Sequence, residues 1–297
     1  MGERVKGKES MIRLAVIQME PRIGEKDENV AKTLDLMEGA AEKGATFVVL
    51  PELCNTGYVF NTMAEAIELS EEIPNGPTVL GWEKKARERN LFIVGGISER
   101  SGQKLFNTSV LIGPEGYIGK YRKLHLWYEE KLFFSPGDVG LPVFDTSIGR
   151  VGMLICYDLW FPESPRILSM EGADLLCSPT NWVPARERKY DELGRSIGVY
   201  LTIANAQSNA VYMACADRIG AERGQTFEGN SLICGPSGWP IAGPASRDKE
   251  ETLMAEINVL DARRAKGWNR LNDLIKDRRT DIYDWMLGYN ASKRFPW

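Results

Sequence analysis

Short, continuously apolar runs alternate with an amphipathic segment at the start of the chain, and this pattern constrains the fold more than any other feature. Residues 46–50 (TFVVL) form one such run, and residues 11–19 (MIRLAVIQM) form another. A strand whose residues are all apolar is buried on both faces, which is typical of parallel strands covered by helices. Between these runs, residues 27–43 carry apolar side chains at helical spacing, namely Val30, Leu34, Met37 and Ala41. The pattern predicts a β-α-β unit in an α/β protein.

The rest of the chain continues this pattern, with pairs of strands in the middle. Helices are predicted over residues 78–90, 162–172 and 190–208, the last weakened by two glycines. Strands are predicted over residues 91–97, 106–113, 117–122, 143–146, 149–156, 173–178 and 211–216. Two further strands, 230–235 and 253–257, flank a turn rich in proline and glycine. We expect two mixed sheets covered by helices.

The division of the chain into parts follows from its composition. No serine- or glycine-rich linker and no shift in composition divides the 297 residues. We therefore expect a single domain over residues 11–262, preceded by a flexible extension at residues 1–10. Residues 263–297 are charged and rich in aromatic residues, which are favoured at interfaces. We expect this tail to pack on its own domain or at a dimer interface.

Charge and hydropathy exclude several classes of partner. The 37 basic and 41 acidic residues give a net charge of -4, so no basic excess is available to bind nucleic acid. No apolar run approaches the roughly 20 residues that span a bilayer, and the polar N-terminus lacks the apolar core of a signal peptide. Five cysteines, an odd number at wide spacing, indicate a reducing compartment. We expect a cytoplasmic protein without a nucleic-acid or membrane partner, whose sequons at Asn107 and Asn290 carry no glycan.

His125 is the only histidine, and this limits the chemistry of the chain. A Ser-His-Asp hydrolase would need it as the base, but no Gly-x-Ser-x-Gly motif supplies the serine. The cysteines lack the spacing of zinc ligands, and neither a phosphate-binding loop nor a dinucleotide-binding motif is present. We expect no metal and no organic cofactor. Acid–base chemistry would then rely on carboxylates or lysine.

Two charged side chains follow the ends of predicted strands, where functional groups gather in α/β sheets. Glu52 follows residues 47–51 (FVVLP), and burial there would raise its pKa towards that of a useful base. Lys123 ends a predicted hairpin strand, where an ammonium group can stabilise an oxyanion. Taken alone, each has an ordinary alternative. Glu52 could be a loop residue that caps the next segment, and Lys123 could be a solvated strand lysine.

Cys156 lies between an apolar strand and a helix that opens near Pro162. A strand-to-helix turn exposes the thiol, and a helix N-terminus favours the thiolate. The alternative is a buried, inert cysteine, which is the commonest state of this residue type. We apply that alternative to the other four: Cys54, Cys177, Cys215 and Cys234.

Together, these three residues resemble the Glu-Lys-Cys triad of the nitrilase superfamily of carbon–nitrogen hydrolases. The surrounding segments also match: PELCNTGY at Glu52, YRKLHLWYEEKLFFSPGD at Lys123 and ICYDLWFPE at Cys156, followed by CSPTNW (177–182) and ADRIGAERG (216–224). The resemblance implies a four-layer αββα sandwich that forms a homodimer or a larger homo-oligomer. It makes Glu52 the general base, Lys123 the electrostatic stabiliser and Cys156 the nucleophile. It also implies a second glutamate after the lysine, and the spacing favours Glu130.

The resemblance implies a cysteine-dependent amidase that hydrolyses a small carboxamide to an acid and ammonia through an acyl-thioester. The residues that follow Cys156 favour a carboxamide substrate, then an N-carbamoyl amine such as carbamoylputrescine, and then a nitrile. Candidate pocket residues are Tyr58, Trp127, Tyr157, Asn181 and Trp182. Two other classes stay open. The chain could be a catalytically silent binding scaffold, or a thiol hydrolase that uses His125 as its base.

Overall fold

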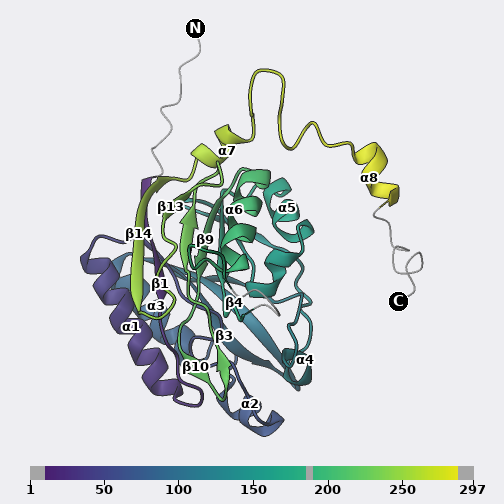
Figure 1. Ribbon diagram of the computed structural model, residues 1–297. Coiled ribbons are helices and arrows are strands. Elements are labelled where there is room, and N and C mark those ends of the chain that lie inside the picture. The colour runs from purple at the N-terminus through teal and green to yellow at the C-terminus, as the bar shows by residue number, and fades with distance from the viewer. Residues whose placement is uncertain (1–10, 185–189, 287–297) are drawn as a thin grey trace.

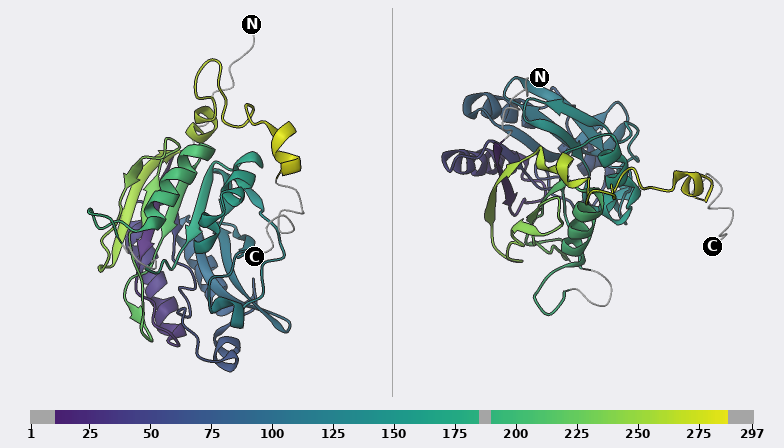
Figure 2. Two further views of the ribbon diagram at one scale, coloured as in Figure 1. Left: turned by 45° about the vertical axis from the view of Figure 1, so that its right-hand side comes forward. Right: turned by 90° about the horizontal axis from the view of Figure 1, so that it is seen from above.

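The computed structural model describes residues 11–184 and 190–286. The predicted flexible extension at residues 1–10 and the end of the predicted tail lie outside the described residues. Two six-stranded sheets lie face to face, and helices cover the outer face of each sheet (Figures 1 and 2). The predicted four-layer αββα arrangement is therefore confirmed.

The first sheet has the strand order β14-β1-β2-β3-β4-β5. β1, β2 and β3 are parallel, whereas β4, β5 and β14 pair antiparallel with their neighbours. The strands span Met11–Gln18 (β1), Phe47–Val49 (β2), Phe92–Ser101 (β3), Lys104–Gly113 (β4), Gly116–Arg122 (β5) and Glu251–Asn258 (β14). The sheet is therefore mixed, as predicted.

The second sheet has the order β13-β12-β9-β8-β7-β6 and repeats this plan. Its parallel strands β7, β8 and β9 are flanked by the antiparallel strands β6, β12 and β13. The strands span Val143–Thr146 (β6), Gly149–Met153 (β7), Leu175–Pro179 (β8), Tyr212–Ala216 (β9), Leu232–Cys234 (β12) and Pro240–Ala242 (β13). A separate ribbon pairs Ala221–Glu222 (β10) with Gln225–Thr226 (β11).

The helices of the outer layers come from the connections between parallel strands. α1 and α3 cover the first sheet, and α5 and α6 cover the second (Figure 1). The helices span Lys26–Glu42 (α1), Met63–Leu69 (α2), Pro77–Arg89 (α3), Glu130–Phe133 (α4), Glu163–Met170 (α5), Ile197–Asn209 (α6), Asp261–Ala265 (α7) and Thr280–Met286 (α8), with a 3₁₀ turn η1 at Cys156–Trp160. The sequence patterns did not predict several short elements, namely α2, α4, α7, α8, η1, β10, β11 and β13.

The continuously apolar strands are buried on both faces. In β1, Leu14 and Val16 pack in the core between the two sheets, whereas Ala15 and Ile17 pack under the helices. In β2, Phe47 belongs to the inter-sheet core and the neighbouring Val48 to the helix-covered core. Successive side chains of a strand point to opposite faces, so a central strand of a four-layer fold needs apolar residues at every position.

The predicted helix over residues 190–208 begins later than expected, at Ile197. A turn precedes it, in which the Asp191 carboxylate accepts hydrogen bonds from the backbone N–H groups of Leu193 and Arg195. Gly194 adopts a left-handed conformation with φ 75°. This conformation and the side-chain hydrogen bonds are incompatible with a continuous helix. The N-terminal part of the predicted helix was therefore wrong.

The predicted strands 230–235 and 253–257 do not form a simple hairpin around their turn. β12 pairs with β9 and β13 in the second sheet, whereas β14 pairs with β1 in the first. The intervening segment crosses from one sheet to the other and contains β13. Local patterns cannot reveal this crossing because strand pairing depends on distant residues.

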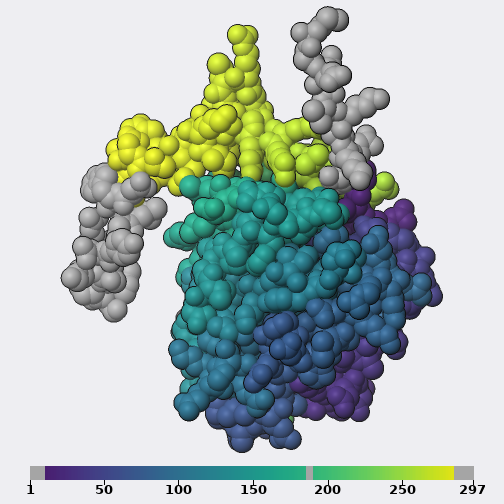
Figure 3. Space-filling model, turned by 180° about the vertical axis from the view of Figure 1, so that it is seen from behind, coloured from purple at the N-terminus to yellow at the C-terminus, as the bar shows by residue number. Residues whose placement is uncertain are grey.

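Beyond α7 the chain leaves the body of the molecule, and α8 stands apart from it (Figures 1 and 3). Trp268 and Leu271 are exposed, with relative accessibilities of 61% and 85%. Lys266 joins the segment to the second sheet's helical layer through a hydrogen bond to the Ser169 carbonyl oxygen. Within the described ranges, no helix has both the length and the apolar character needed to cross a bilayer.

Candidate active site

A cluster of buried charges lies at the end of the first sheet. Lys123 follows β5 directly, and its Nζ lies 2.6 Å from Glu52 Oε1 and 2.8 Å from Glu130 Oε1. Glu52 follows β2, and Glu130 opens α4. The two carboxylates therefore hold the ammonium between them, and the structure brings together three of the four residues that the sequence nominated. The neighbouring Glu129 is exposed, whereas Glu130 is buried.

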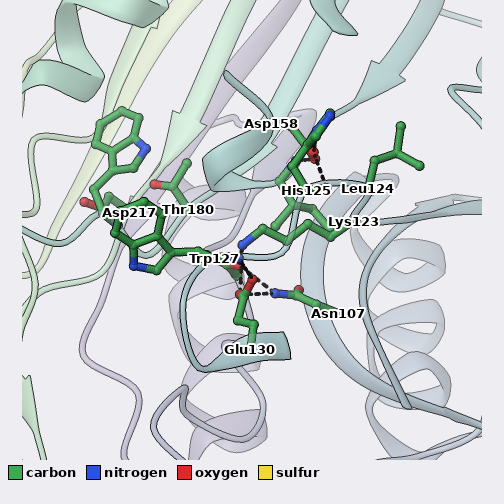
Figure 4. A network of polar contacts seen from close by, with 12 residues as sticks. Asn107, Lys123, Leu124, His125, Trp127, Glu130, Asp158, Thr180 and Asp217 are labelled. Carbon is green, nitrogen blue, oxygen red and sulfur yellow. Dashed lines mark hydrogen bonds and ion pairs between the residues drawn. The ribbon is translucent and has the colours of Figure 1, made fainter. Parts of the chain in front are cut away.

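Asn107 joins this cluster, and the sequence analysis assigned it no role there. Its Nδ2 donates hydrogen bonds to Glu52 Oε1 (2.6 Å) and to Glu130 Oε1 (2.9 Å). Its backbone carbonyl oxygen accepts a hydrogen bond from the N–H of Lys123. Figure 4 shows Asn107, Lys123 and Glu130 converging from β4, the end of β5 and α4. A polar asparagine inside the apolar strand 106–113 was the available signal.

The electrostatics of the cluster set its protonation. Burial raises the pKa of the Glu52 carboxyl to about 7; the ammonium of Lys123 opposes this rise, and Glu130 adds to it. Burial alone would lower the pKa of Lys123, but the carboxylates of Glu130 and Glu52 outweigh it and raise the pKa above its usual value. Lys123 is therefore a fixed cation, whereas Glu52 can exchange a proton near neutral pH.

Cys156 is the first residue of η1 and lies three residues beyond β7. Its φ of 47° is left-handed, which is strained for a residue with a β-carbon and is common at functional sites. The backbone amide of Asn181, two residues past β8, donates towards its sulfur. The strand ends thus place Cys156 within electrostatic reach of Glu52 and Lys123.

The expectation that a helix N-terminus stabilises the Cys156 thiolate was wrong. Burial, and next the charge of Glu52, raise the pKa of the thiol well above its usual value. The residue opens only a short 3₁₀ turn, and α5 starts seven residues later at Glu163. A short turn has little dipole, so the thiol is protonated at rest and needs a base to remove its proton.

The single histidine supports the turn after the cysteine. His125 Nδ1 lies 2.7 Å from Asp158 Oδ1, and its ring stacks on Phe161 with 3.7 Å between the ring centroids. Asp158 also accepts hydrogen bonds from the backbone N–H of Ile155 and from the Tyr121 hydroxyl. Figure 4 shows His125 directed towards Asp158, away from the cluster around Lys123. This arrangement does not support His125 as the base for Cys156.

Two adjoining cavities open beside these residues, and both are lined by Trp127. The larger has a volume of about 410 Å³ and is lined by Cys156 and by four of the predicted pocket residues, namely Trp127, Tyr157, Asn181 and Trp182. The smaller has a volume of about 270 Å³ and is lined by Glu130 and the fifth, Tyr58. The Trp127 and Tyr157 rings are 4.8 Å apart. The site is therefore an aromatic cleft with the thiol and Glu130 of the charged cluster in its walls.

Comparison with known proteins identifies the family. The model of the carbon-nitrogen hydrolase family matches residues 13–266, which is most of the chain. The chain belongs to this family. A protein from Pyrococcus abyssi named nitrilase is 43% identical over 273 residues, covering 92% of this chain and 99% of that protein. The predicted membership of the nitrilase superfamily is confirmed, and the chain is a carbon–nitrogen hydrolase.

Two further proteins similar to this hydrolase carry amidase names, and a third carries the family name. The N-carbamoylputrescine amidase of Solanum lycopersicum is 32% identical, with 89% of this chain and 91% of that protein covered. A crystal structure of a carbon-nitrogen hydrolase from Helicobacter pylori G27 matches with a TM-score of 0.80 at 26% identity, covering 94% of this chain and 99% of the other. An amidase from Nesterenkonia sp. matches with a TM-score of 0.74 at 25% identity, covering 95% and 98%.

Proposed function

We propose that this hydrolase is a cysteine-dependent amidase that cleaves the C–N bond of a small carboxamide through an acyl-thioester on Cys156. The observation that carries the proposal is the buried Glu52–Lys123–Glu130 cluster beside a strained thiol in the wall of an aromatic cavity. The named amidase relatives support the same reaction class.

Glu52 is the proposed base in the first step. Its Oε2 is buried and has no hydrogen-bond partner among the described residues, so this oxygen is available to accept a proton. Glu52 takes the thiol proton of Cys156 as the sulfur attacks the amide carbon. A carboxylate with a pKa of about 7 can both take this proton and return it at neutral pH.

Lys123 and a backbone amide are the proposed oxyanion donors. Two of the three N–H bonds of Lys123 point at Glu52 and Glu130, so the third is available for the tetrahedral oxygen. The backbone N–H of Tyr157 is the second donor. Donors of this kind contribute about 3–4 kcal/mol each to the transition state. Glu130, held by the backbone N–H of Trp127, orients the ammonium.

The cycle ends with hydrolysis of the thioester. Glu52 returns its proton to the nitrogen, the C–N bond breaks and ammonia leaves. A water molecule then gives a proton to Glu52 and attacks the acyl carbon. The C–S bond breaks, the acid leaves and Glu52 returns the proton to the sulfur of Cys156.

The proposal is tested by ammonia release from small amides, N-carbamoyl amines and nitriles. We expect wild type to release ammonia from amides and Cys156→Ala to lose about a thousandfold or more of this activity. Cys234→Ala, a buried cysteine in β12, is the matched control and should stay active. Equal activity of Cys156→Ala and wild type would contradict the mechanism. Iodoacetamide should label Cys156 first, whereas a silent scaffold should show no reactive outlier.

Two substrate classes are the alternatives, and each has a relative that favours it. The name of the Pyrococcus abyssi protein favours a nitrile, and that of the Solanum lycopersicum protein favours an N-carbamoyl amine. Cys156-dependent ammonia release from only one of these classes would keep the nucleophile and replace the carboxamide as the substrate.

We also propose that the protein forms a homodimer through the outer helices of its second sheet. α5 and α6 pack against each other and expose Ile167, Met170, Ile197 and Tyr200. We expect light scattering to give a dimer for wild type and a monomer for Ile167→Glu. Leu80→Glu, a similarly exposed position on α3, should remain dimeric. A monomeric wild type or a dimeric Ile167→Glu would contradict this proposal.

A further inference from the structure

Asn181 lies in the wall of the cavity that Cys156 also lines. The residue is 1% exposed, and neither Nδ2 nor Oδ1 has a hydrogen-bond partner among the described residues. Its backbone N–H donates towards the Cys156 sulfur, so the Cα that carries its side chain lies near the reacting sulfur atom. Buried polar groups are nearly always paired, because an unpaired group has lost its water without compensation.

The other buried asparagines do not share this state. Each uses at least one side-chain polar atom in a hydrogen bond to the described part of the protein: Asn29, Asn55, Asn107, Asn205, Asn209 and Asn230. The indole Nε1 of Trp182, in the same cavity wall, is a further buried donor with no partner in the described ranges. Asn181 and Trp182 therefore place buried polar atoms without a described partner in the wall of the cavity that Cys156 lines.

The chemistry of the wall defines the group that would bind there. An asparagine amide offers two donors and an acceptor, so its complement is a group that also both donates and accepts. Among the described residues that line this cavity, Lys131 is the only charged one, and it is exposed. Aromatic and aliphatic side chains form most of the remaining wall. A neutral polar group on an otherwise apolar acyl chain fits this environment.

We propose that Asn181 selects substrates whose acyl part carries a second neutral donor–acceptor group, such as a carboxamide, a few bonds from the scissile carbonyl. This inference rests on the proposed function, because it assumes that the acyl group attached to Cys156 lies in the cavity that Asn181 lines. It adds a substrate class to the reaction, and Asn181 becomes its specificity-determining residue.

The first test compares two amides of nearly the same shape. Succinamide ends in a second carboxamide, whereas 4-methylpentanamide has an isopropyl group in its place. Because succinamide has two equivalent carboxamides, its kcat/KM is about twofold higher for statistical reasons alone. Beyond this factor, we expect the kcat/KM of wild type to be about tenfold to a hundredfold higher for succinamide than for 4-methylpentanamide. Equal values for the two amides, or a preference for 4-methylpentanamide, would overturn the proposal.

The second test asks whether a substitution at Asn181 abolishes the preference for succinamide over 4-methylpentanamide. Asn181→Leu keeps the shape of the side chain and removes its polar atoms, so the preference for succinamide should vanish, chiefly through lower kcat/KM for that substrate. Asn61→Leu, at an exposed position outside both cavities, is the control and should keep the wild-type preference. The labelling rate of Cys156 by iodoacetamide verifies that the variant is folded around the thiol. If Asn181→Leu does not fold, Asn181→Ala replaces it. A folded variant that keeps the preference would refute the role of Asn181.

A third test distinguishes recognition of a charged group from recognition of a neutral hydrogen-bonding group. Its outcomes also distinguish failure of this inference from failure of the proposed function. Succinamate carries a carboxylate where succinamide carries the second carboxamide. A preference for succinamate that disappears in Lys131→Ala would replace the inference with recognition of an anion. If hydrolysis of both amides needs Cys156 but kcat/KM is no higher for succinamide than for 4-methylpentanamide, the amidase function stands and only this inference is rejected. Absence of hydrolysis of every amide tested would reject both.

Discussion

Glu52 combines two properties that rarely occur together in a carboxylate. It is fully buried beside a cation, yet burial outweighs that cation and its pKa rises to about 7. One of its oxygens binds Lys123 and Asn107, while the other has no partner among the described residues. The side chain is therefore held in place by one oxygen and reactive through the other.

This arrangement predicts the pH dependence of kcat/KM. Glu52 must be ionised to take the proton of Cys156, so activity should rise about tenfold per pH unit below its pKa and level off above about 7. Measurement of kcat/KM for an amide between pH 5 and pH 8 checks this prediction. A flat profile over that range would exclude Glu52 as the base.

The hydrogen bonds of Asn107 predict that its substitution shifts the pH profile of kcat/KM. Its Nδ2 donates to the carboxylates of Glu52 and Glu130, and a donor of this kind favours the ionised form. Asn107→Leu should therefore raise the pKa of Glu52 and move the rise in kcat/KM upward by roughly one pH unit. A purely structural role would lower activity without moving the profile. Asn205→Leu, at another buried asparagine that binds the Leu159 carbonyl oxygen, is the control.

At the scale of elements, the position of Glu52 depends on the close approach of β3. Gly96 donates its N–H to the Pro51 carbonyl oxygen, and its own carbonyl oxygen accepts the N–H of Cys54. A β-carbon at Gly96 would lie 2.5 Å from the Cα of Glu52 and from the N of Leu53. The glycine is required by this contact, since its own φ is not left-handed.

Gly96→Ala should therefore move the Glu52 segment. We expect a loss of about 1–3 kcal/mol in the free energy of unfolding and a fall of about tenfold or more in kcat/KM, because the backbone must shift. Gly39→Ala in α1 is the matched control: no atom outside its own helix lies within 4 Å of the new β-carbon, and alanine should stabilise the helix by about 0.5–1 kcal/mol. Urea denaturation and steady-state kinetics measure both effects. If the two variants behaved alike, the contact would not constrain Glu52.

In α1 the hydrophobic pattern located the helix correctly and its inner face in part. Of the predicted apolar positions, Met37 is buried, and Leu34 and Ala41 pack partly buried against the core. The other buried residues of the helix include two polar ones, Asn29 and Thr33. The Thr33 hydroxyl accepts a hydrogen bond from the Trp82 indole of α3. A polar residue can face inward when a distant side chain pairs with it, and the local pattern does not contain that partner.

At the scale of the whole molecule, the buried Glu52 should make stability depend on pH. Its pKa rises from 4.5 to about 7 on folding, so the folded state binds an additional proton between these values. The stabilisation is complete below pH 4.5 and is lost as the pH rises through 7. The loss is on the order of 3 kcal/mol, since one pKa unit corresponds to about 1.4 kcal/mol.

Glu52→Gln should remove this dependence. The variant keeps the shape of the side chain but cannot ionise, so its melting temperature relative to wild type should be higher at pH 8 than at pH 5. Melting curves of both proteins at the two pH values provide the measurement. A difference that is the same at both values, or larger at pH 5, would show that ionisation of Glu52 does not oppose folding.

The sequence alone determined the family, most of the strands and long helices, and the residues nominated for the chemistry. Buried parallel strands have apolar side chains on both faces, and the reactive residues Glu52, Lys123 and Cys156 follow their strands in recognisable segments. These signals are local, so they can be identified in the amino-acid string.

Only the tertiary structure decided how distant residues meet. It brought Asn107 to Glu52 and Glu130, assigned the segments at 230–235 and 253–257 to different sheets, and raised the pKa of the Cys156 thiol. Each outcome depends on burial and on side chains far apart in the chain. Desolvation and strand pairing arise only when the two sheets pack together, which is why the sequence pattern could not supply them.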